Sequence, residues 1–292
     1  MIADSHCHAW RRWPYDLKVP DPDHRGSIEA LLYEMDTHGV ERAAVVCARI
    51  GAGNGGNGYG NDDNNTYVST FAQKHPDRIS AWVDFDCVWR TEHHTPGAPK
   101  RLQAELEINR AKGFTHYVEA RNDGWLLTDE GHACFELAAK LQVVASLAIS
   151  PAWLSDLRTI AQLHPTLPFL IHHMGGLLCN SPTYSNDVME LVKCAAVPNI
   201  NLKISGFNYS SALKWNFPYN DSQELFRSIY EAFGATRLFW ASDFPASRDL
   251  LTYTQAIEVL RTHCNFVPQT AMELILGDNL NRLLNYPIHV SA

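Results

Sequence analysis

Short apolar runs alternate with amphipathic stretches from one end of the chain to the other. Eight of these runs have the length of a strand: Ile2–His8, Ala43–Ala48, Ile79–Phe85, Phe114–Glu119, Val143–Ile149, Pro168–Met174, Ile200–Ile204 and Leu238–Ser242. Each run is nearly continuous in hydrophobicity, which is typical of parallel strands that are buried on both faces of a sheet. The pattern therefore predicts a parallel sheet.

The segments between these runs have helical spacing, with apolar residues recurring every three or four positions. Leu154, Leu157 and Ile160 show this spacing, and so do Leu225 and Ile229. Strand and helix patterns thus alternate eight times, which is the repeat of a (β/α)₈ barrel. We predict the α/β class and a single-domain TIM barrel that spans residues 1–292.

A doubly wound open sheet is the alternative architecture. Such a sheet usually carries a glycine-rich phosphate loop after an early strand, whereas here the first strand ends in His6-Cys7-His8. The length of 292 residues is above the roughly 250 residues typical of one barrel, and 46% of the residues are hydrophobic, enough for a large core. These features favour the barrel.

Two long connections follow the first two strands, Trp10–Arg25 and Gly51–Asn65. Loops after the strands form the rim of a barrel's active site. The second loop is rich in glycine and asparagine, so it is either a mobile lid or a flexible insertion. Five aromatic residues in the loops after strands are expected either to stack on a substrate ring or to pack the loops onto the barrel: Trp10, Trp13, Tyr15, Trp89 and Trp125.

The net charge of −8 argues against a nucleic acid or an anionic membrane as partner, because basic clusters supply those affinities. No apolar run reaches the about 18 residues of a membrane span, and Met1–Asp4 lacks a basic signal-peptide start. The seven cysteines show no CxxC spacing, as expected of reduced thiols. We expect a cytoplasmic protein with a small-molecule substrate, and the sequence does not indicate an oligomeric state.

Candidate chemistry gathers at three predicted strand ends. His6 and His8 are two positions apart on an extended segment, so their side chains point to the same side. This pair suits a metal ion or the polarisation of a carbonyl group. The sixth strand runs into His172 and His173, and the eighth runs into Asp243. Polar residues at such ends are typical of catalytic sites, and an aspartate there is a candidate general base or metal ligand.

These motifs carry a family resemblance. Asp4-Ser5-His6-Cys7-His8, His173-Met174-Gly175 and Trp240-Ala241-Ser242-Asp243-Phe244-Pro245 resemble the strand-one, strand-six and strand-eight signatures of the amidohydrolase superfamily. His75–Ile79 and Leu202–Gly206 resemble its entry to strand three and its strand seven. Within the superfamily, the chain is most similar to the amidohydrolase-2 branch, which contains sugar-acid lactonases and 2-pyrone-4,6-dicarboxylate lactonase.

The resemblance implies roles for individual residues. It assigns catalysis to Asp243, His173, His6 and His8, and it makes the same four residues the ligands if a divalent ion, most simply one Zn²⁺, is bound. His172 stands where relatives often carry an aspartate, and we expect it to support its neighbours rather than to react.

The chain also departs from the family pattern. Many metal-dependent members carry a further histidine after strand five, but Val143–Ile149 contains none. Strand four, Phe114–Glu119, has no lysine that could be carbamylated to bridge two metals. The lactonase branch is the one in which a tightly held metal is least expected. The resemblance therefore implies a lactone hydrolase of carbohydrate or aromatic catabolism. A zinc-dependent decarboxylase or other hydrolase of the branch, or a catalytically silent binding barrel, remain as alternatives.

For the lactone reaction, we expect Asp243 to activate water while the histidines polarise the carbonyl. Arg121, Lys203 and Arg49 are candidates for substrate binding, because a cationic side chain suits a carboxylate or sugar hydroxyls. A surface salt bridge at Arg121 and an inter-strand ion pair at Lys203 are the alternatives. The histidines outside the matched motifs are expected mostly to be exposed or capping groups: His93, His94, His116, His132, His164 and His263.

Overall fold

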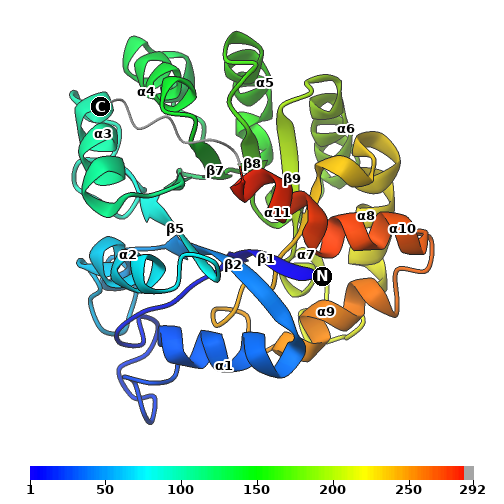
Figure 1. The fold of residues 1–292 in the computed structure, drawn as a ribbon. Helices are drawn as coiled ribbons and strands as arrows, with labels where there is room; N and C mark the ends of the chain where they lie inside the picture. Colours follow the sequence, from blue (N-terminus) through cyan, green and yellow to red (C-terminus); the bar gives the residue numbers. More distant parts are fainter. Residues whose placement is uncertain (286–292) are drawn as a thin grey trace.

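The computed structural model describes residues 1–285, in which a ring of helices surrounds a central sheet (Figure 1). Residues 286–292 of the predicted domain lie outside the described residues. The main sheet has eight parallel strands in the order β1-β2-β5-β6-β7-β8-β9-β10. The strands, with a separate short pair β3 and β4, are β1 (Ile2–Cys7), β2 (Val40–Cys47), β3 (Gly51–Ala52), β4 (Gly55–Gly56), β5 (Ile79–Asp84), β6 (Gly113–Tyr117), β7 (Val144–Ala148), β8 (Phe169–Ile171), β9 (Ile200–Ile204) and β10 (Leu238–Trp240).

The first and last strands of the sheet meet at a seam. Instead of a regular ladder, two backbone hydrogen bonds join the segments just beyond the strands. The amide of Asp243 donates to the carbonyl of His6 over 2.8 Å, and the amide of His8 donates to the carbonyl of Phe244 over 2.6 Å. These bonds close the sheet into a nearly complete barrel, which confirms the predicted (β/α)₈ fold.

The helices cover the outside of the sheet with one apolar face each. In α5 the side chains of Leu154, Leu157 and Ile160 are fully buried, as their spacing predicts. Burying such a side chain contributes about 1.5–3 kcal/mol. The helices are α1 (Ile28–His38), α2 (Asn64–Lys74), α3 (Ala98–Asn109), α4 (Asp129–Lys140), α5 (Leu154–Leu163), α6 (Tyr184–Lys193), α7 (Phe207–Ser210), α8 (Asn220–Phe233), α9 (Tyr253–Arg261), α10 (Gln269–Glu273) and α11 (Asn279–Leu284).

An apolar layer fills one end of the barrel. Leu280 and Leu284 of α11 pack against it, and α11 crosses the middle of the ring in Figure 1. One inward-facing residue from each of six strands makes up the rest of the layer: Ala3, Ala44, Trp82, Val144, Leu170 and Phe239. The apolar side chains occupy this end of the barrel, and the polar side chains gather at the strands' carboxyl ends.

Two strands are shorter than the apolar runs predicted. Pro168–Met174 was expected to be extended throughout, but β8 ends before His173, where φ is +46°. The strand predicted over Leu238–Ser242 is shorter as well, because β10 ends at Trp240. Asp243, which follows, has a φ of +56°. A left-handed backbone cannot continue a strand. Hydrophobicity continues past the point at which these strands end, so the pattern overestimated their length.

The glycine-rich loop Gly51–Asn65 packs on the loop Trp10–Arg25. The amide of Gly58 donates to the carbonyl of Pro14 over 2.7 Å, and a Cβ on Gly58 would lie 2.4 Å from that carbonyl carbon. This close approach requires glycine. The side-chain amide of Asn64 donates to the carbonyl of Ala9 over 3.0 Å. The loop is therefore tied to its neighbour, and its role as a lid stays a prediction.

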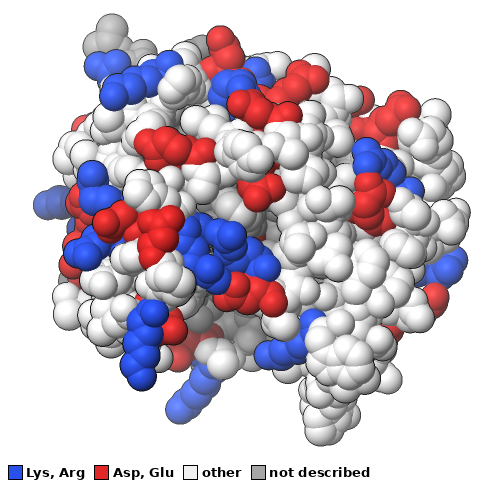
Figure 2. All heavy atoms as spheres, turned by 90° about the horizontal axis from the view of Figure 1, so that it is seen from below, with Lys and Arg blue, Asp and Glu red and all other residues white. Residues whose placement is uncertain are grey.

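None of the helices within residues 1–285 combines the length and the apolar character that a bilayer crossing needs. All seven cysteines are free thiols, and only Cys179 among them is partly exposed. On the face shown in Figure 2, basic and acidic side chains lie next to one another, and a central group of Lys and Arg atoms is bordered by acidic ones. Exposed pairs of this kind contribute little to stability, about 0–1 kcal/mol each.

Candidate active site

Four predicted polar side chains converge where β1, β8 and β10 end. His6 belongs to β1, and His8 follows it directly. His173 begins the short turn after β8, and Asp243 lies just beyond β10. His6, His8 and Asp243 are at most 4% exposed. The structure thus brings together all four residues that the sequence predicted, at the end of the barrel where active sites of this fold lie.

Asp243 is the centre of this cluster. Its Oδ1 lies 3.3 Å from Nε2 of His8, 3.4 Å from Nε2 of His6 and 3.9 Å from Nε2 of His173. The Nε2 atoms of His6 and His8 are 3.1 Å apart. The hydroxyl of Tyr209 donates to Oδ2 of Asp243 over 2.5 Å. One carboxylate oxygen therefore faces three imidazoles, while the other is held by a phenol.

This environment keeps Asp243 ionised. Burial alone would raise the pKa of its carboxyl, but the neighbouring His173, His8 and the hydroxyl of Tyr209 outweigh burial and lower the pKa. Its left-handed backbone is uncommon for a residue with a side chain. The hydrogen bond from the backbone amide of Asp243 to the carbonyl of His6 holds this conformation. Backbone strain of this kind clusters at functional sites, and an ionised, fixed carboxylate is suited to accept a proton.

The surroundings of His8 and His173 fix the orientation of each ring. Nδ1 of His8 donates to the carbonyl of Val46 over 2.9 Å, and the ring stacks on Trp10 with 4.9 Å between centroids. A carbonyl only accepts, so neutral His8 carries its proton on Nδ1 and presents a lone pair on Nε2. Nδ1 of His173 lies 2.9 Å from Oγ of Ser205, which can donate or accept.

Lys203 lies inside the barrel below His6. Its Nζ is 3.0 Å from Nδ1 of His6 and donates to Oγ of Ser146 over 2.6 Å. The ammonium is also 4.6 Å from the centroid of the Trp82 ring. Burial lowers the pKa of Lys203 well below its ordinary value, and burial together with Lys203 lowers the pKa of His6. Lys203 thus faces the lumen, and its partners are an imidazole and a hydroxyl rather than the carboxylate of an inter-strand ion pair.

His172 lies beside the cluster, as its supporting role predicts. Its Nε2 is 2.6 Å from Oγ of Ser146, and its ring centroid is 4.3 Å from that of His6. Its Nδ1 is buried without a hydrogen-bond partner in the described residues. Ser146 therefore links His172 to Lys203 in one chain of polar contacts, and one nitrogen of His172 remains available to a bound group.

Asp4 ties the two halves of the site together from beneath. Its Oδ1 accepts from the amide of Ser242 over 3.0 Å and from the amide of His6 over 3.1 Å. The hydroxyl of Tyr253 donates to Oδ2 over 3.0 Å. Burial raises the pKa of Asp4 to about 6, although these hydrogen bonds oppose the shift. The carboxyl group of Asp4 therefore holds the seam beside His6 and Ser242, next to the cluster.

The cluster can hold one divalent ion. Ligand atoms of His6, His8 and Asp243 lie within 4.8 Å of one another, and a second, overlapping group contains His6, His172 and His173. The lone pair on Nε2 of His8 and the unpartnered Nδ1 of His172 are suitable donors. Imidazole and carboxylate are ligands that Zn²⁺ takes in proteins. The residues therefore fit a single ion, whose identity the donor set does not determine.

The two arginine candidates are placed differently. The guanidinium of Arg49 contacts Asp84 at 3.4 Å and donates to Glu105 over 3.1 Å, so internal carboxylates already engage it. Arg121 lies exposed beyond β6, and none of the ion pairs within residues 1–285 includes it. Binding of substrate by Arg121, Arg49 or Lys203 stays a prediction.

The loop after β1 places aromatic rings over the site. Trp10 and Trp13 are at most 4% exposed, and each packs against Tyr15 with centroids 5.5 Å and 5.3 Å away. A hollow of about 400 Å³ beside them is lined by Trp13, Tyr15, Arg25 and Tyr209, among others. Because Tyr209 also contacts the carboxylate of the cluster, this hollow is the natural approach to the site.

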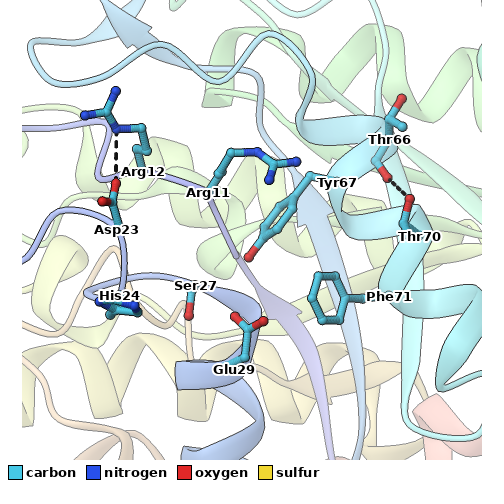
Figure 3. A pocket seen from close by; sticks show the side chains of 10 residues that line it. All are labelled: Arg11, Arg12, Asp23, His24, Ser27, Glu29, Thr66, Tyr67, Thr70 and Phe71. Carbon is cyan, nitrogen blue, oxygen red and sulfur yellow. Dashed lines mark hydrogen bonds and ion pairs between the residues drawn. The ribbon is translucent and has the colours of Figure 1, made fainter.

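A second hollow, of about 750 Å³, lies between the starts of α1 and α2 (Figure 3). Arg12 and Asp23 form an ion pair at its edge, and the side chain of Arg11 lies over the ring of Tyr67. None of the predicted site residues lines this hollow. Its size therefore does not make it the site of the chemistry.

Sequence reasoning missed several supporting residues. Tyr209 in α7 and Ser205 after β9 contact the cluster, and Ser146 in β7 contacts His172 and Lys203 beside it. The position of Ser205 at a strand end was the only signal that could have identified one of them. The prediction for His116 was wrong: it is 1% exposed, and Nε2 of His94 lies 3.1 Å from its own Nε2. Alternation along β6 turns His116 towards the helices, where the core buries it.

Comparisons with known proteins agree with this architecture. A family model described as amidohydrolase matches residues 3–285. A solved amidohydrolase from Burkholderia multivorans with bound zinc has a TM-score of 0.75 and 17% identity, over 98% of this chain and 100% of that one. A probable 2-pyrone-4,6-dicarboxylic acid hydrolase from Acinetobacter baumannii has a TM-score of 0.75 and 19% identity, over 98% and 99%.

A third solved structure, 5-carboxyvanillate decarboxylase from Sphingomonas paucimobilis, has a TM-score of 0.66 and 13% identity, over 98% of this chain and 99% of that one. At these identities the similarities to solved structures establish the fold alone. Among curated protein sequences, none matches the chain significantly.

Proposed function

The chain belongs to the amidohydrolase family, and on this premise we propose that it hydrolyses a lactone, with Asp243 as the base that activates water. The observation that carries the proposal is the placement of this ionised carboxylate within 3.9 Å of three imidazoles. Opening a lactone needs an activated water, a polarised carbonyl and a proton for the departing alkoxide. The cluster contains groups for all three.

The hydrogen-bond partners of the histidines separate donors from acceptors. When Lys203 donates to Nδ1 of His6, neutral His6 carries its own proton on Nε2 and can donate it. A hydroxyl of Ser205 that donates to His173 has the same effect on that ring. His8 presents a lone pair instead. His6 and His173 are therefore the oxyanion donors in this proposal, and loss of one such donor costs about 3–4 kcal/mol.

The proton then moves through Asp243. Asp243 removes a proton from water as the water oxygen bonds to the lactone carbonyl carbon. His6 and His173 donate to the carbonyl oxygen as it becomes negative. The tetrahedral species collapses by breaking the bond between the carbonyl carbon and the ring oxygen. Asp243 returns the proton to that oxygen, so that one lactone and one water give one hydroxy acid.

A divalent ion held by His6, His8 and Asp243 would add Lewis-acid polarisation of the carbonyl. For His6 to bind through Nε2, its proton must lie on Nδ1, where a neutral Lys203 would accept it. Burial lowers the pKa of Lys203, which makes the neutral amine accessible. Lys203 therefore decides whether Nε2 of His6 acts as a donor or as a ligand.

The hollow next to Tyr209 indicates the substrate class. Trp13, Tyr15 and Tyr209 line it with aromatic surface. Asp16 and the ion pair of Arg25 with Asp249 add charged groups to its wall. Aromatic walls combined with charged groups suit a small ring that carries polar substituents. The similar structure from Acinetobacter baumannii is described as acting on a pyrone dicarboxylate. We propose a pyrone-type or sugar-acid lactone as the substrate.

Decarboxylation is the second candidate function. The trio of His6, His8 and Asp243 fits a metal ion, and one similar structure is a decarboxylase. Such a reaction would release CO₂ from an aromatic acid and would be abolished by a chelator. Lactone hydrolysis would instead release acid without CO₂, so the two functions differ in a directly measurable product.

The test measures acid release from aldonolactones and pyrone lactones, and CO₂ release from aromatic acids, with and without chelator. Asp243→Asn should lower kcat for the lactone by about 10²–10⁴-fold because the base is lost. Asp129→Asn, an exposed aspartate on α4, is the matched control and should behave as wild type. CO₂ release without lactone turnover would replace the proposal with decarboxylation. Full activity in Asp243→Asn would refute the mechanism.

A further inference from the structure

A second group of histidines lies outside the active site, which we call the rim histidine cluster: His93, His94 and His116. His116 belongs to β6, while the other two lie in the segment between β5 and α3. One ring nitrogen of each lies within 4.8 Å of the others, and the Nε2 atoms of His94 and His116 are 3.1 Å apart.

The rim histidine cluster faces away from the catalytic residues. His116 packs on Trp125 with 5.1 Å between ring centroids, on the helix side of the barrel. The next residue, Tyr117, has its ring 5.1 Å from that of His172 in the active site. Successive residues of a strand point to opposite faces. The two clusters therefore lie on opposite sides of the same sheet.

The partners of the three rings fix where their protons are. Nδ1 of His116 lies 3.0 Å from the carbonyl of Phe85, and Nδ1 of His93 lies 2.6 Å from the carbonyl of Asp86. These two partners can only accept, so each Nδ1 must carry a proton. In a neutral imidazole the remaining nitrogen is then a bare lone pair.

His94 follows the same rule. Its Nδ1 is 2.6 Å from a carboxylate oxygen of Asp123, another group that only accepts when ionised. Its ring is stacked on Trp125, 4.4 Å away and nearly parallel, so the ring cannot turn freely. The Nε2 lone pairs of His94 and His116 consequently face each other at 3.1 Å, which is repulsive. Nε2 of His93 is buried without any partner in the described residues.

This arrangement needs a positive charge among the three nitrogen atoms. A proton on His94, paired with Asp123 and shared with His116, would satisfy two of the three nitrogen atoms. It would, however, leave Nε2 of His93 bare and place an imidazolium beside His116, which is 1% exposed. Burial makes that charge costly. A divalent ion accepts all three lone pairs at once and leaves every ring neutral. The ring of His93 stacks on that of His94 with 3.7 Å between centroids, so His93 must turn for its lone pair to meet the other two at one ion.

We propose that His93, His94 and His116 bind one Zn²⁺, at a site distinct from the active site. Three imidazoles with a water in the fourth position form a tetrahedral zinc site. The carboxylate of Asp123 behind His94 is the kind of outer partner that orients a zinc-bound imidazole. The ion would join the segment after β5 to β6 and, through Asp123, to the loop after β6. This site does not depend on the lactone reaction.

Zinc titration of the full-length protein tests the site directly, after removal of any purification tag and of bound metal. Calorimetry with ZnCl₂, and visible spectra with Co²⁺, should show one tetrahedral site that His94→Gln abolishes. His132→Gln, a partly buried histidine outside both clusters, should retain the site. His93→Gln provides a second variant in case His94→Gln does not fold.

A background of His6→Gln, which removes the residue shared by both candidate metal groups of the active site, separates the rim site from any ion there. In this background one equivalent of zinc should remain, and adding His94→Gln or His93→Gln should remove it. Zinc should also slow proteolysis of the segment after β5 in wild type but not in these variants. Unchanged zinc stoichiometry and affinity in both folded variants would overturn the proposal. A loss that occurs equally in His132→Gln would also overturn it.

Discussion

The candidate active site and the rim histidine cluster are both built from imidazole side chains, but the surroundings of these side chains differ. Each gathers three imidazoles near the carboxyl end of a strand, and each contains left-handed residues that carry a side chain, His173 and Asp243 in one and His94 in the other. In the rim histidine cluster every ring has an acceptor at Nδ1, so the lone pair of each neutral ring is on Nε2. In the active site a lysine faces one Nδ1, which breaks this uniformity.

That difference shows that the chemistry of a histidine cluster depends more on the hydrogen-bond partners of each ring than on the number of rings. When Lys203 donates to His6, it and the carbonyl of Val46 at His8 place the protons of the two rings at opposite nitrogen atoms. Asp243 then supplies an acceptor in their midst. A site whose histidines carry their protons on different ring nitrogens has both donors and acceptors and suits proton transfer. A site whose histidines all carry the proton on Nδ1 offers only lone pairs at Nε2 and suits the binding of a cation.

The largest expected difference comes from substituting one histidine of each cluster and measuring lactone turnover of both variants in the same assay. His173→Ala should lower kcat by about 10²–10³-fold, because it removes a proposed oxyanion donor. His94→Gln should leave lactone turnover within about twofold of wild type, since the rim faces away from the lumen. Steady-state kinetics on both variants would settle this, and an equal loss in the two would mean that the clusters are not separate.

The next largest effect is expected at Lys203, which contacts His6 and has no counterpart in the rim histidine cluster. Lys203→Met should lower kcat by roughly 10–100-fold, because the partner that orients His6 is lost. Thermal stability should be retained or rise, since a buried cation is replaced by an apolar chain of similar length. Lys193→Met on exposed α6 is the control. A rise in KM with unchanged kcat would instead indicate that Lys203 contacts substrate.

Tyr209→Phe probes the phenol that holds Asp243. The hydrogen bond to a charged group contributes about 1.5–3 kcal/mol when intact, and partial replacement by water should reduce the effect on kcat to about tenfold. Tyr33→Phe removes a hydroxyl from an exposed tyrosine and should have no effect. Measured kcat for the two variants compares them directly, and equal rates would show that Asp243 does not need this contact.

The smallest expected effect concerns the carboxylate behind the rim. Asp123→Asn should weaken zinc binding by roughly tenfold, because outer partners of zinc-bound imidazoles tune affinity. Lactone turnover should not change. Calorimetric titration of Asp123→Asn beside Asp129→Asn measures the difference, and a matching zinc affinity would show that Asp123 does not orient His94.

Much of this molecule could be predicted from hydrophobic runs and strand ends. The eight runs became the eight strands of the barrel, and His6, His8, His173 and Asp243 meet because parallel strands end on one side. The ends of β8 and β10 could not be predicted, because left-handed residues interrupt apolar stretches there.

Other features depend on which way a side chain points. Tyr209 and Ser205 contact the site from segments without periodicity. The meeting of His93 and His94 with His116 depends on the register between β5 and β6 and on the loop that follows β5. A pattern of hydrophobicity contains neither kind of information, so these contacts emerge only in three dimensions.

The seam between β1 and β10 links closure of the barrel to assembly of the site during synthesis and folding. The hydrogen bonds that close the barrel belong to His6, His8 and Asp243, or to the residue next to Asp243. One part of the site is therefore synthesised long before the other. A nascent chain holds His6 and His8 without their carboxylate until synthesis passes Asp243. Activity should thus appear only when the barrel closes, and the onset of turnover during synthesis or refolding would mark the last step of folding.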